Sequence, residues 1–250
     1  MTADGVTSYE RMIVAASREL VDTDVCLVGI GAPSAACNLA RLTHAPGLVL
    51  IYESGTLETR PRFLPLSIGD GELCDTALTT VSVPELFRYW LQGGRITKGF
   101  LGGAQIDRFG NINTTVIGTY EHPTARLPGS GGAPEIASAC QEVLITAQHS
   151  PRTFVSELDF VTSLGHGNGP DGRGSAGLST RGPVAVITDM CIMRPHPGTA
   201  ELQVTEIHAD ITIEQIRAAT GWPIDIAEGA TAGRPVTSTE LEALRKFRNR

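Results

Sequence analysis

Short apolar runs alternate with stretches of helical periodicity along most of the chain. In residues 8–20, Met12, Ile13, Ala16 and Leu20 recur at helical spacing, so the spacing predicts a helix that Ser8 can cap. Apolar runs of four to six residues are typical of strands that are buried on both faces of a parallel sheet. They predict strands at residues 25–28, 48–52, 96–101, 143–147, 158–162 and 184–188.

Helical patterns follow several of these runs, often after a glycine-rich turn. They predict helices from about residue 34 to 42 and at residues 84–91, 134–139, 213–219 and 240–248. Pro84 stands at the favoured first position of its helix, and Gly93-Gly94 ends that helix. Residues 56–82 and the glycine-rich stretch 165–177 lack such a period, so we expect mainly loops there.

This alternation of strands and helices predicts an open α/β fold with a mainly parallel central sheet flanked by helices. The sequence has no internal repeat and no Pro/Ser-rich linker, so we expect a single domain over residues 1–250. Glycine clusters fall repeatedly just after the predicted strands. In open α/β sheets this edge is where ligands bind.

Composition narrows the classes of function. The 250-residue chain has a formal net charge of −7 and only 5% aromatic residues, which argues against nucleic-acid binding. The longest apolar runs have five or six residues, far short of the roughly 20 that span a bilayer, so we expect no membrane association.

The cysteines predict reduced thiols. Cysteine occurs at positions 26, 37, 74, 140 and 191, an odd number without CxxC spacing. Cys26 and Cys191 lie in apolar runs and are expected in the core. With no signal-like segment at residue 1 onward, these thiols indicate a cytoplasmic protein. No cluster of ligands indicates a metal site.

Glu53 is the first candidate for chemistry. It is a lone carboxylate at the end of the apolar run 48–52 and is followed by Ser54-Gly55. Partial desolvation at a strand end would make the carboxylate more nucleophilic toward a carbonyl carbon. A solvated glutamate at the end of a strand is the alternative, and position alone favours it.

The glycine segment 129–132 is the second candidate, because glycines before a helix expose backbone N–H groups that can hold an oxyanion or a phosphate. An ordinary tight turn is the alternative. No Lys-Ser/Thr follows, which excludes a P-loop, and Gly29-Ile30-Gly31 lacks the third glycine of a dinucleotide fingerprint. The six histidines are scattered; His122 and His166, in loops near glycines, could touch a substrate.

Four segments together resemble the β subunits of class I (heteromeric) CoA-transferases, in the branch of glutaconate CoA-transferase. They are Tyr52-Glu53-Ser54-Gly55, residues 100–107 (FLGGAQID), residues 110–115 (GNINTT) and residues 129–133 (GSGGA). Three others resemble the β subunits of the 3-oxoadipate-specific transferases: residues 68–72 (IGDGE), 87–95 (FRYWLQGGR) and 182–189 (GPVAVITD). The resemblance covers roughly residues 8–245.

This resemblance implies that Glu53 is the catalytic nucleophile, which reverses the interpretation from position alone. It implies transfer of CoA from succinyl-CoA to 3-oxoadipate through a glutamyl-CoA thioester, with the acyl-CoA and the dicarboxylate as substrates and without a permanently bound cofactor or a metal. Gly131 and Gly132 become the expected oxyanion donors. Gly102, Gly103, Ala104 and Gln105 become the expected wall for CoA.

The resemblance also implies a partner. A homologous α subunit is expected, in a one-to-one pair or in a tetramer of two α and two β subunits. Other acceptors in the glutaconate branch remain an alternative. So does a CoA-ester hydrolase or decarboxylase on the same fold, although the nucleophile position is altered in those relatives. For the distal carboxylate of the acceptor, the candidates are Arg60, Arg62, Arg95 and Arg126.

Overall fold

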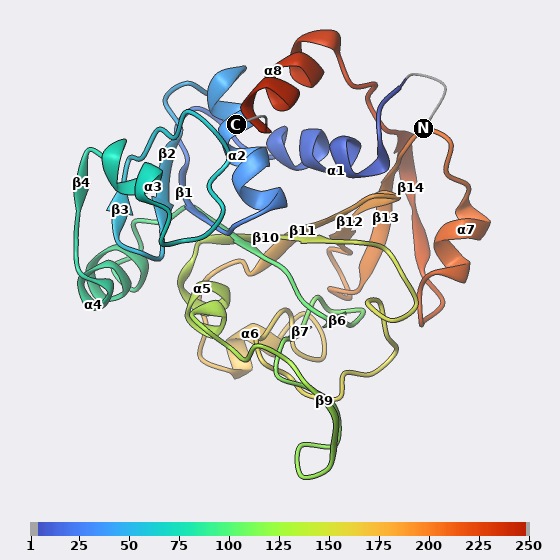
Figure 1. Ribbon diagram of the computed structural model, residues 1–250. Helices are drawn as coiled ribbons and strands as arrows, with labels where there is room; N and C mark the ends of the chain where they lie inside the picture. The colour runs from blue at the N-terminus through green and yellow to red at the C-terminus, as the bar shows by residue number, and fades with distance from the viewer. Residues whose placement is uncertain (1–4, 249–250) are drawn as a thin grey trace. The chain divides into compact units, whose positions relative to one another are not determined.

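The computed structural model describes residues 5–248, and the chain divides into two compact units. Unit 1 consists of the described residues of Met1–Phe100 and Pro235–Arg250, and unit 2 is Leu101–Arg234 (Figure 1). In the sequence, unit 2 is therefore an insertion into unit 1. That the whole chain acts as a single domain stays a prediction.

Unit 1 is an α/β unit. Its elements in chain order are α1 (Ser8–Ser17), β1 (Val25–Val28), α2 (Ala32–Leu42), β2 (Val49–Tyr52), β3 (Thr56–Leu57), α3 (Gly71–Asp75), β4 (Thr79–Thr80), α4 (Val83–Glu85), the π-helix η1 (Leu86–Leu91), β5 (Lys98–Leu101) and α8 (Ser238–Arg248). β1 pairs in parallel with both β2 and β5, while β2, β3 and β4 pair in antiparallel order.

Three helices of unit 1 pack together. α1 contacts α2 and α8, and α2 contacts α8, so that the three lie on the same side of β1 and β2 (Figure 1). Cys26 of β1 is fully buried, as expected, and its Sγ lies 3.6 Å from Sγ of Cys37 in α2. The apolar runs that predicted strands are thus the central strands under a helical layer.

The start of α1 differs from the sequence prediction. The residue that caps it is Thr7 rather than Ser8, because the Thr7 hydroxyl accepts a hydrogen bond from the N–H of Glu10 at 3.1 Å. The Glu10 carboxylate accepts the Thr7 N–H in return at 2.9 Å, which completes a capping box. The helix ends at Ser17 rather than at Leu20, although Leu20 is still buried.

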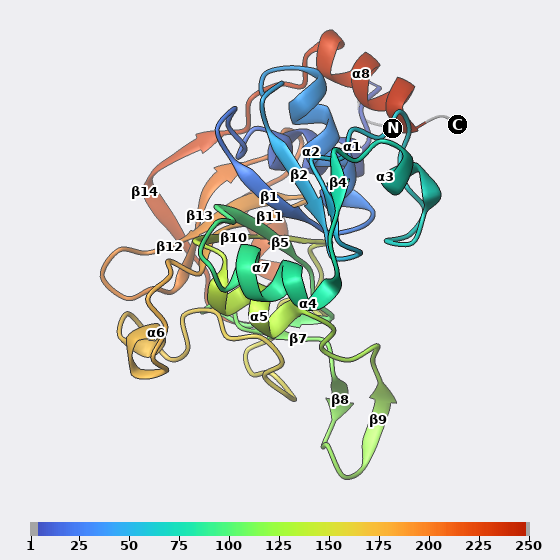
Figure 2. The same ribbon diagram turned by 90° about the vertical axis from the view of Figure 1, so that its left-hand side faces the viewer.

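The elements of unit 2 are β6 (Gln105–Ile106), β7 (Ile112–Asn113), β8 (Val116–Gly118), β9 (Pro123–Arg126), α5 (Ala133–Ala139), β10 (Glu142–Ala147), α6 (Gly172–Ser175), β11 (Pro183–Thr188), β12 (Cys191–Pro195), β13 (Leu202–Ile207), α7 (Ile213–Ala218) and β14 (Asp225–Ala232). Unit 2 combines the paired strands β10 to β14 with two small hairpins, β6–β7 and β8–β9. β10–β11 and β13–β14 are parallel pairs, whereas β12 pairs with both β11 and β13 in antiparallel order. The β8–β9 hairpin extends away from the rest of unit 2 (Figure 2).

The predicted fold class is confirmed: strands and helices alternate, and β1, β2, β5, β10 and β11 form parallel pairs that carry the core. The strand predicted at 158–162 is wrong. Val161 is half exposed in this segment, which forms isolated contacts instead of a strand ladder: the Asp159 carboxylate accepts a hydrogen bond from the Gln105 amide at 2.7 Å, and the Thr162 N–H donates to the Ile112 carbonyl at 2.8 Å. Within residues 165–177, expected to be a loop, the short helix α6 forms.

Residues 5–248 contain neither a membrane-spanning helix nor a metal cluster. In this part of the chain, no helix is both long and apolar enough to cross a membrane. The same residues contain no group of three or more His, Cys, Asp or Glu side chains arranged to hold a metal ion. None of the five cysteines, all of which lie within residues 5–248, forms a disulfide.

Candidate active site

Glu53 lies in a three-residue loop between β2 and β3 of unit 1. The two strands form a hairpin in which Tyr52 pairs with Thr56, so Glu53, Ser54 and Gly55 make the loop. Three-residue hairpin loops favour a last residue in the left-handed region, and Gly55 has φ +94°. The Gly55 N–H donates to the Tyr52 carbonyl at 2.9 Å and closes the loop. This geometry leaves the Glu53 side chain half-buried at the end of a buried strand.

Gly55 also fits a second constraint. Its carbonyl accepts a hydrogen bond from the Val81 N–H at 2.9 Å, which brings the segment beyond β4 against the loop. A Cβ atom at position 55 would lie 2.0 Å from the Val81 carbonyl oxygen. The glycine of the Glu-Ser-Gly motif is therefore required by backbone conformation and by close packing, which the sequence pattern alone did not explain.

Tyr52 anchors the start of the loop. Its side chain is fully buried, and its hydroxyl lies 2.7 Å from the Ser34 hydroxyl and 3.4 Å from the Asn38 amide nitrogen, both in α2. Burial, the largest cause, raises the pKa of Tyr52 well above its usual value, so the side chain stays a neutral phenol. A buried, hydrogen-bonded ring thus fixes the backbone immediately before Glu53.

Two hydroxyl groups in the Glu53 loop and the first residue of β3 lack hydrogen-bond partners. The Ser54 Oγ and the Thr56 Oγ1 are both buried, and within residues 5–248 neither has a partner. A buried hydroxyl without a hydrogen bond costs about 1–3 kcal/mol. No sequence motif marks Thr56, and only the burial of its hydroxyl in the structure draws attention to it. These two hydroxyls are available to donate to oxygens of a ligand.

The predicted CoA wall, Gly102 to Gln105, lies in unit 2. A Cβ at Gly103 would be 2.3 Å from the Ile112 side chain, so this glycine lets β7 pack closely. The Gln105 side chain is occupied within the unit: it donates to Asp159 at 2.7 Å and accepts from Asn113 at 2.7 Å. In this structure, the Gln105 amide therefore holds neighbouring segments together.

The predicted oxyanion donors, Gly131 and Gly132, lie just before α5 in unit 2. Gly131 has φ +49°, with open space where a Cβ would lie, and Gly132 is the N-cap residue of α5. In the described part of the chain, no acceptor pairs with either backbone N–H. Glu53 belongs to unit 1, so the structure does not bring it together with these glycines within one unit.

The side chains proposed for substrate contact are partly occupied. Arg62 pairs with Glu72, with an N–O distance of 2.9 Å, and Arg60 pairs with Glu58 at 3.1 Å. Arg95 lies over the Trp90 ring, and Arg126 lies 4.6 Å from the Tyr120 ring centroid.

The histidines show a feature that sequence reasoning missed. His122 is exposed, and the half-buried His166 ring bonds to the Pro183 carbonyl at 2.8 Å. His149, which the sequence did not distinguish from the other scattered histidines, is buried between the Thr188 and Thr220 hydroxyls. Burial lowers its pKa to about 4. No spacing pattern distinguishes this ring from an exposed one.

Together, these residues offer a half-buried carboxylate on a closed hairpin loop, with two hydroxyls nearby in the sequence that have no partner among residues 5–248. A carboxylate held in this way can attack an activated carbonyl carbon, such as that of a thioester, and form an acyl intermediate. The uncommitted N–H groups of Gly131 and Gly132 are of the type that stabilises the oxyanion of such a reaction.

Comparison with known proteins identifies the family to which this chain is related. Residues 9–219 match the family model described as coenzyme A transferase. The chain is 58% identical over 244 residues to the β subunit of the 3-oxoadipate CoA-transferase of Pseudomonas knackmussii, a match that covers 98% of this chain and 94% of the relative. It is 33% identical over 235 residues to the β subunit of the glutaconate CoA-transferase of Acidaminococcus fermentans, with 92% and 88% covered.

The fold is similar to that of a solved enzyme. The crystal structure of glutaconate coenzyme A-transferase from Acidaminococcus fermentans superimposes with a TM-score of 0.92 at 30% identity, covering 98% of this chain and 95% of that one. The family match spans most of the chain, and the curated relatives match nearly end to end. The chain belongs to the coenzyme A transferase family.

Proposed function

We propose that this chain is the β subunit of a 3-oxoadipate CoA-transferase, which moves CoA from succinyl-CoA to 3-oxoadipate. One observation carries the proposal: the Glu-Ser-Gly motif forms a closed hairpin loop that holds Glu53 half-buried at a strand end. The 58% identity to the corresponding subunit of a 3-oxoadipate CoA-transferase supports the choice of acceptor. The reaction conserves the thioester, so it needs neither ATP nor a metal.

The proposed reaction passes through covalent intermediates on Glu53. The Glu53 carboxylate attacks the thioester carbon of succinyl-CoA, and the C–S bond breaks to give a mixed anhydride and CoA thiolate. The thiolate attacks the glutamyl carbonyl, which yields a glutamyl-CoA thioester and releases succinate. The carboxylate of 3-oxoadipate then attacks this thioester and frees the thiolate again. Attack of the thiolate on the 3-oxoadipyl carbonyl gives 3-oxoadipyl-CoA and restores the Glu53 carboxylate.

Each of these steps has a tetrahedral oxyanion, which needs preorganised hydrogen-bond donors. The backbone N–H groups of Gly131 and Gly132 are our proposed donors, supported by their lack of acceptors among residues 5–248. The Ser54 hydroxyl, buried and unused, is a further proposed donor beside the reacting carboxylate. The Gly102–Gln105 segment is proposed to face the pantetheine arm through its backbone.

Water must be excluded, because an anhydride or a glutamyl thioester exposed to water would hydrolyse. We propose that a homologous α subunit provides this closure, as a pair or in a tetramer, so the chain alone is half of an enzyme. The curated relatives are themselves named as subunits, which supports this proposal. The free thiols support a reducing, cytoplasmic location.

The test is to co-express the chain with its α subunit and to supply succinyl-CoA and 3-oxoadipate. We expect 3-oxoadipyl-CoA to form and Glu53→Gln to abolish its formation, because the amide cannot attack the thioester. Borohydride reduction should trap the wild-type thioester at Glu53, where mass spectrometry detects it. Glu58→Gln is the matched control, since Glu58 lies on the same hairpin segment but in an exposed ion pair with Arg60.

Three results would overturn the proposal. Release of free CoA without 3-oxoadipyl-CoA would indicate a hydrolase, and preference for another dicarboxylate would indicate a different acceptor. Full activity of the chain without an α subunit would contradict the half-enzyme proposal.

A further inference from the structure

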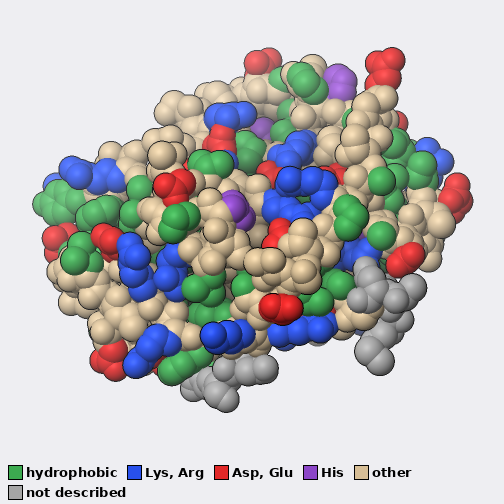
Figure 3. Space-filling model, turned by 90° about the horizontal axis from the view of Figure 1, so that it is seen from above, with side chains coloured by type: hydrophobic (Ala, Val, Ile, Leu, Met, Phe, Trp, Pro, Cys, Tyr) green, Lys and Arg blue, Asp and Glu red, His purple; other side chains and the backbone are tan. Residues whose placement is uncertain are grey.

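A concave pocket of about 720 Å³ lies on unit 1, away from the loop that carries Glu53. Three separate segments line it: the C-terminal end of α2, the stretch after β3 and the last turns of α8. The lining residues are Arg41, Leu42, Arg60, Pro61, Arg62, Ala243, Lys246 and Phe247. Figure 3 views the molecule from the side on which α8 lies and shows Lys and Arg side chains at several places on that face, with Asp and Glu side chains between them.

The position of the pocket follows from the topology of unit 1. α2 returns from the end of β1 to the start of β2, so Arg41 lies near the first residues of β2. β3 runs antiparallel to β2, and the Thr59 N–H bonds to the Leu50 carbonyl at 3.2 Å, so Arg60 also lies toward that end. Glu53 follows the opposite end of β2. The pocket is therefore separate from the reacting carboxylate.

Arg41 is the most deeply placed cation in the pocket. One of its terminal nitrogens donates to the Asn38 side chain at 3.3 Å and to the Pro61 carbonyl at 3.2 Å. Its Nε is buried and, among the described residues, has no hydrogen-bond partner. Burial, and then the charge of Arg60, lowers the pKa of Arg41. An anion in the pocket would offset the repulsion between the two guanidinium groups.

The charges around the pocket are not balanced. Of the four cations, Arg62 pairs with Glu72, and Arg60 makes a more exposed pair with Glu58. Arg41 and Lys246 have no ion-pair partner within residues 5–248, and none of the lining residues is acidic. This local positive charge stands out in a chain whose formal net charge is −7.

The shape and lining favour one class of anion. Leu42, Pro61, Ala243 and Phe247 add apolar surface, and the volume suits a small organic molecule rather than a bare ion. Cations from three segments converge on it, and a phosphate group presents three terminal oxygens, whereas a carboxylate presents two. Guanidinium groups match phosphate oxygens in a bidentate fashion.

We propose that this pocket binds a small phosphate monoester with an apolar or aromatic body, such as a nucleoside monophosphate. The phosphate lies among Arg41, Arg60 and Lys246, and the body lies against the apolar lining. Because Arg41 belongs to α2 and Lys246 to α8, a bound ligand links these two helices. The proposal concerns a second site and does not depend on the reaction at Glu53.

The experiment is calorimetric titration of the full chain, alone and in complex with its α subunit, with adenosine 5′-monophosphate. We expect saturable binding of the nucleotide, whereas adenosine, which lacks the phosphate, does not bind. In a thermal melt, the bound nucleotide should raise the melting temperature of the protein by mass action. Lys246→Gln and Arg60→Gln, both at exposed side chains, should each weaken binding about tenfold. Arg181→Gln, which removes an exposed arginine of unit 2, is the matched control and should leave affinity unchanged.

Several outcomes would overturn this proposal. If adenosine binds as tightly as adenosine 5′-monophosphate, the pocket does not recognise the phosphate. If inorganic phosphate binds as tightly, the apolar lining does not contribute to binding. Loss of binding on addition of the α subunit would identify the pocket as a subunit contact. Glu53→Gln should bind the nucleotide normally, and a loss of binding in that variant would instead place the nucleotide at the reacting site.

Discussion

Gly55 determines how Glu53 is presented, although it takes no part in the proposed chemistry. Its left-handed φ and the 2.0 Å approach of the Val81 carbonyl to a Cβ at this position act independently. The positive φ alone would tolerate a strained alanine. The close Val81 carbonyl would not, because the backbone at Val81 or at residue 55 would have to move. The motif glycine is thus explained by the loop and the chain segment packed on it.

The first prediction concerns Gly55→Ala. We expect it to lower the free energy of unfolding by about 3 kcal/mol or more, because strain at positive φ adds to a backbone clash. Gly94→Ala is the control: Gly94 also has positive φ, +71°, but its Cβ position is open, so a loss of about 1 kcal/mol is expected. Urea unfolding measures both, and equal losses would contradict the role assigned to Val81.

The second prediction concerns the pH dependence of stability. His149 stacks on Phe154 with ring centroids 4.3 Å apart, and burial lowers its pKa to about 4, below the value of about 6.5 in the unfolded chain. The unfolded state therefore binds the proton more tightly. The contribution of the neutral His149 ring to the free energy of unfolding is complete above pH 6.5. It is lost as the pH falls toward 4, and the loss reaches about 2 kcal/mol at pH 5.

Urea unfolding at several pH values between 7 and 4.5 tests this contribution. His149→Gln should flatten the dependence in that window relative to the wild type, while His122→Gln, at an exposed ring, should not. His166, whose pKa burial also lowers, contributes with the same sign, so the difference between variants isolates His149. The carboxyl of Glu10, with a pKa of about 2, acts only below about pH 4.5. An unchanged slope in His149→Gln would disprove the assignment.

At the scale of single residues, the sequence predicted features that a motif marks and missed features that depend on burial in the folded chain. Glu53 was singled out as the candidate nucleophile because a family pattern surrounds it, and the structure explains the glycine that follows in the motif. Both Thr7 and Ser8 have side chains that can cap a helix. Thr7 is the cap because Glu10, three residues later, completes a capping box with it. The burial of His149 depends on β11 and on the segment that follows α7, which are far away in sequence.

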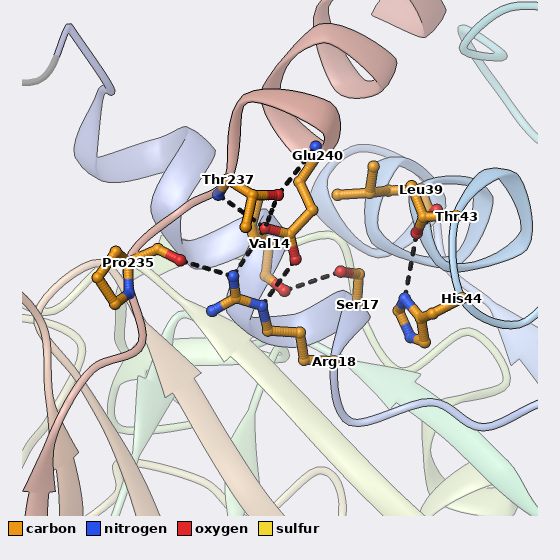
Figure 4. Close-up of polar contacts among 9 residues, drawn as sticks. All are labelled: Val14, Ser17, Arg18, Leu39, Thr43, His44, Pro235, Thr237 and Glu240. Carbon is orange, nitrogen blue, oxygen red and sulfur yellow. Dashed lines mark hydrogen bonds and ion pairs between the residues drawn. The ribbon is translucent and has the colours of Figure 1, made fainter.

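Two ion pairs connect helices from the opposite ends of the chain. Arg18, the C-cap residue of α1, donates to both carboxylate oxygens of Glu240 in α8 at 2.8 and 2.7 Å, and also to the Pro235 carbonyl at 2.8 Å (Figure 4). Arg245 of α8 reaches back to Glu10 at 2.8 Å. The pKa of Glu240 is raised by burial and lowered more by its bonds to Arg18 and Thr237, to about 2, so the pair stays charged at neutral pH.

The third prediction is a double-mutant cycle on the pair Arg18–Glu240. Both side chains are only 13% exposed and the contact is bidentate, so we expect a coupling energy of about 1–2 kcal/mol. The more exposed pair Arg60–Glu58 is the matched control and should couple by less than about 0.5 kcal/mol. Chemical denaturation of the Arg18→Met, Glu240→Gln and double variants gives the value, and additivity would refute the link.

Long, continuous apolar runs predicted strands, whereas β12 and β13 were missed although part of each is buried. β1, β2, β10 and β11 are nearly completely buried, and their apolar runs indicated them. β14 has no buried side chain and therefore no hydrophobic period, so it was missed. β6 and β7 have two residues each and are joined by the Gln105 and Asn113 side chains, contacts that no local pattern encodes.

At the scale of the whole chain, α8 completes unit 1 across a long insertion. Leu244 and Phe247 are buried, and the Phe247 carbonyl accepts a hydrogen bond from the Leu64 N–H at 3.1 Å. Sequence spacing predicted the helix itself, but not that it belongs with residues from the first hundred. This assignment required the contacts of α8 with α1 and α2.

The fourth prediction is the effect of removing residues 235–250. Unit 1 then loses the helix that covers α1 and α2, so we expect its amides to lose protection from hydrogen exchange, while peptides of unit 2 keep theirs. Mass spectrometry of the truncated chain gives both readouts in one sample. Glu242→Gln, an exposed change on α8, is the control, and retained protection of α1 in the truncated chain would contradict the prediction.

The insertion of unit 2 has a consequence for synthesis on the ribosome. The first hundred residues emerge with the apolar surfaces of α1 and α2 uncovered, and α8 follows only after the roughly 130 residues of unit 2. At about 5–20 residues per second, this delay is on the order of ten seconds. During that interval the nascent chain exposes surface that a chaperone would recognise, so its yield in a cell should depend on translation speed and chaperone supply as well as on final stability.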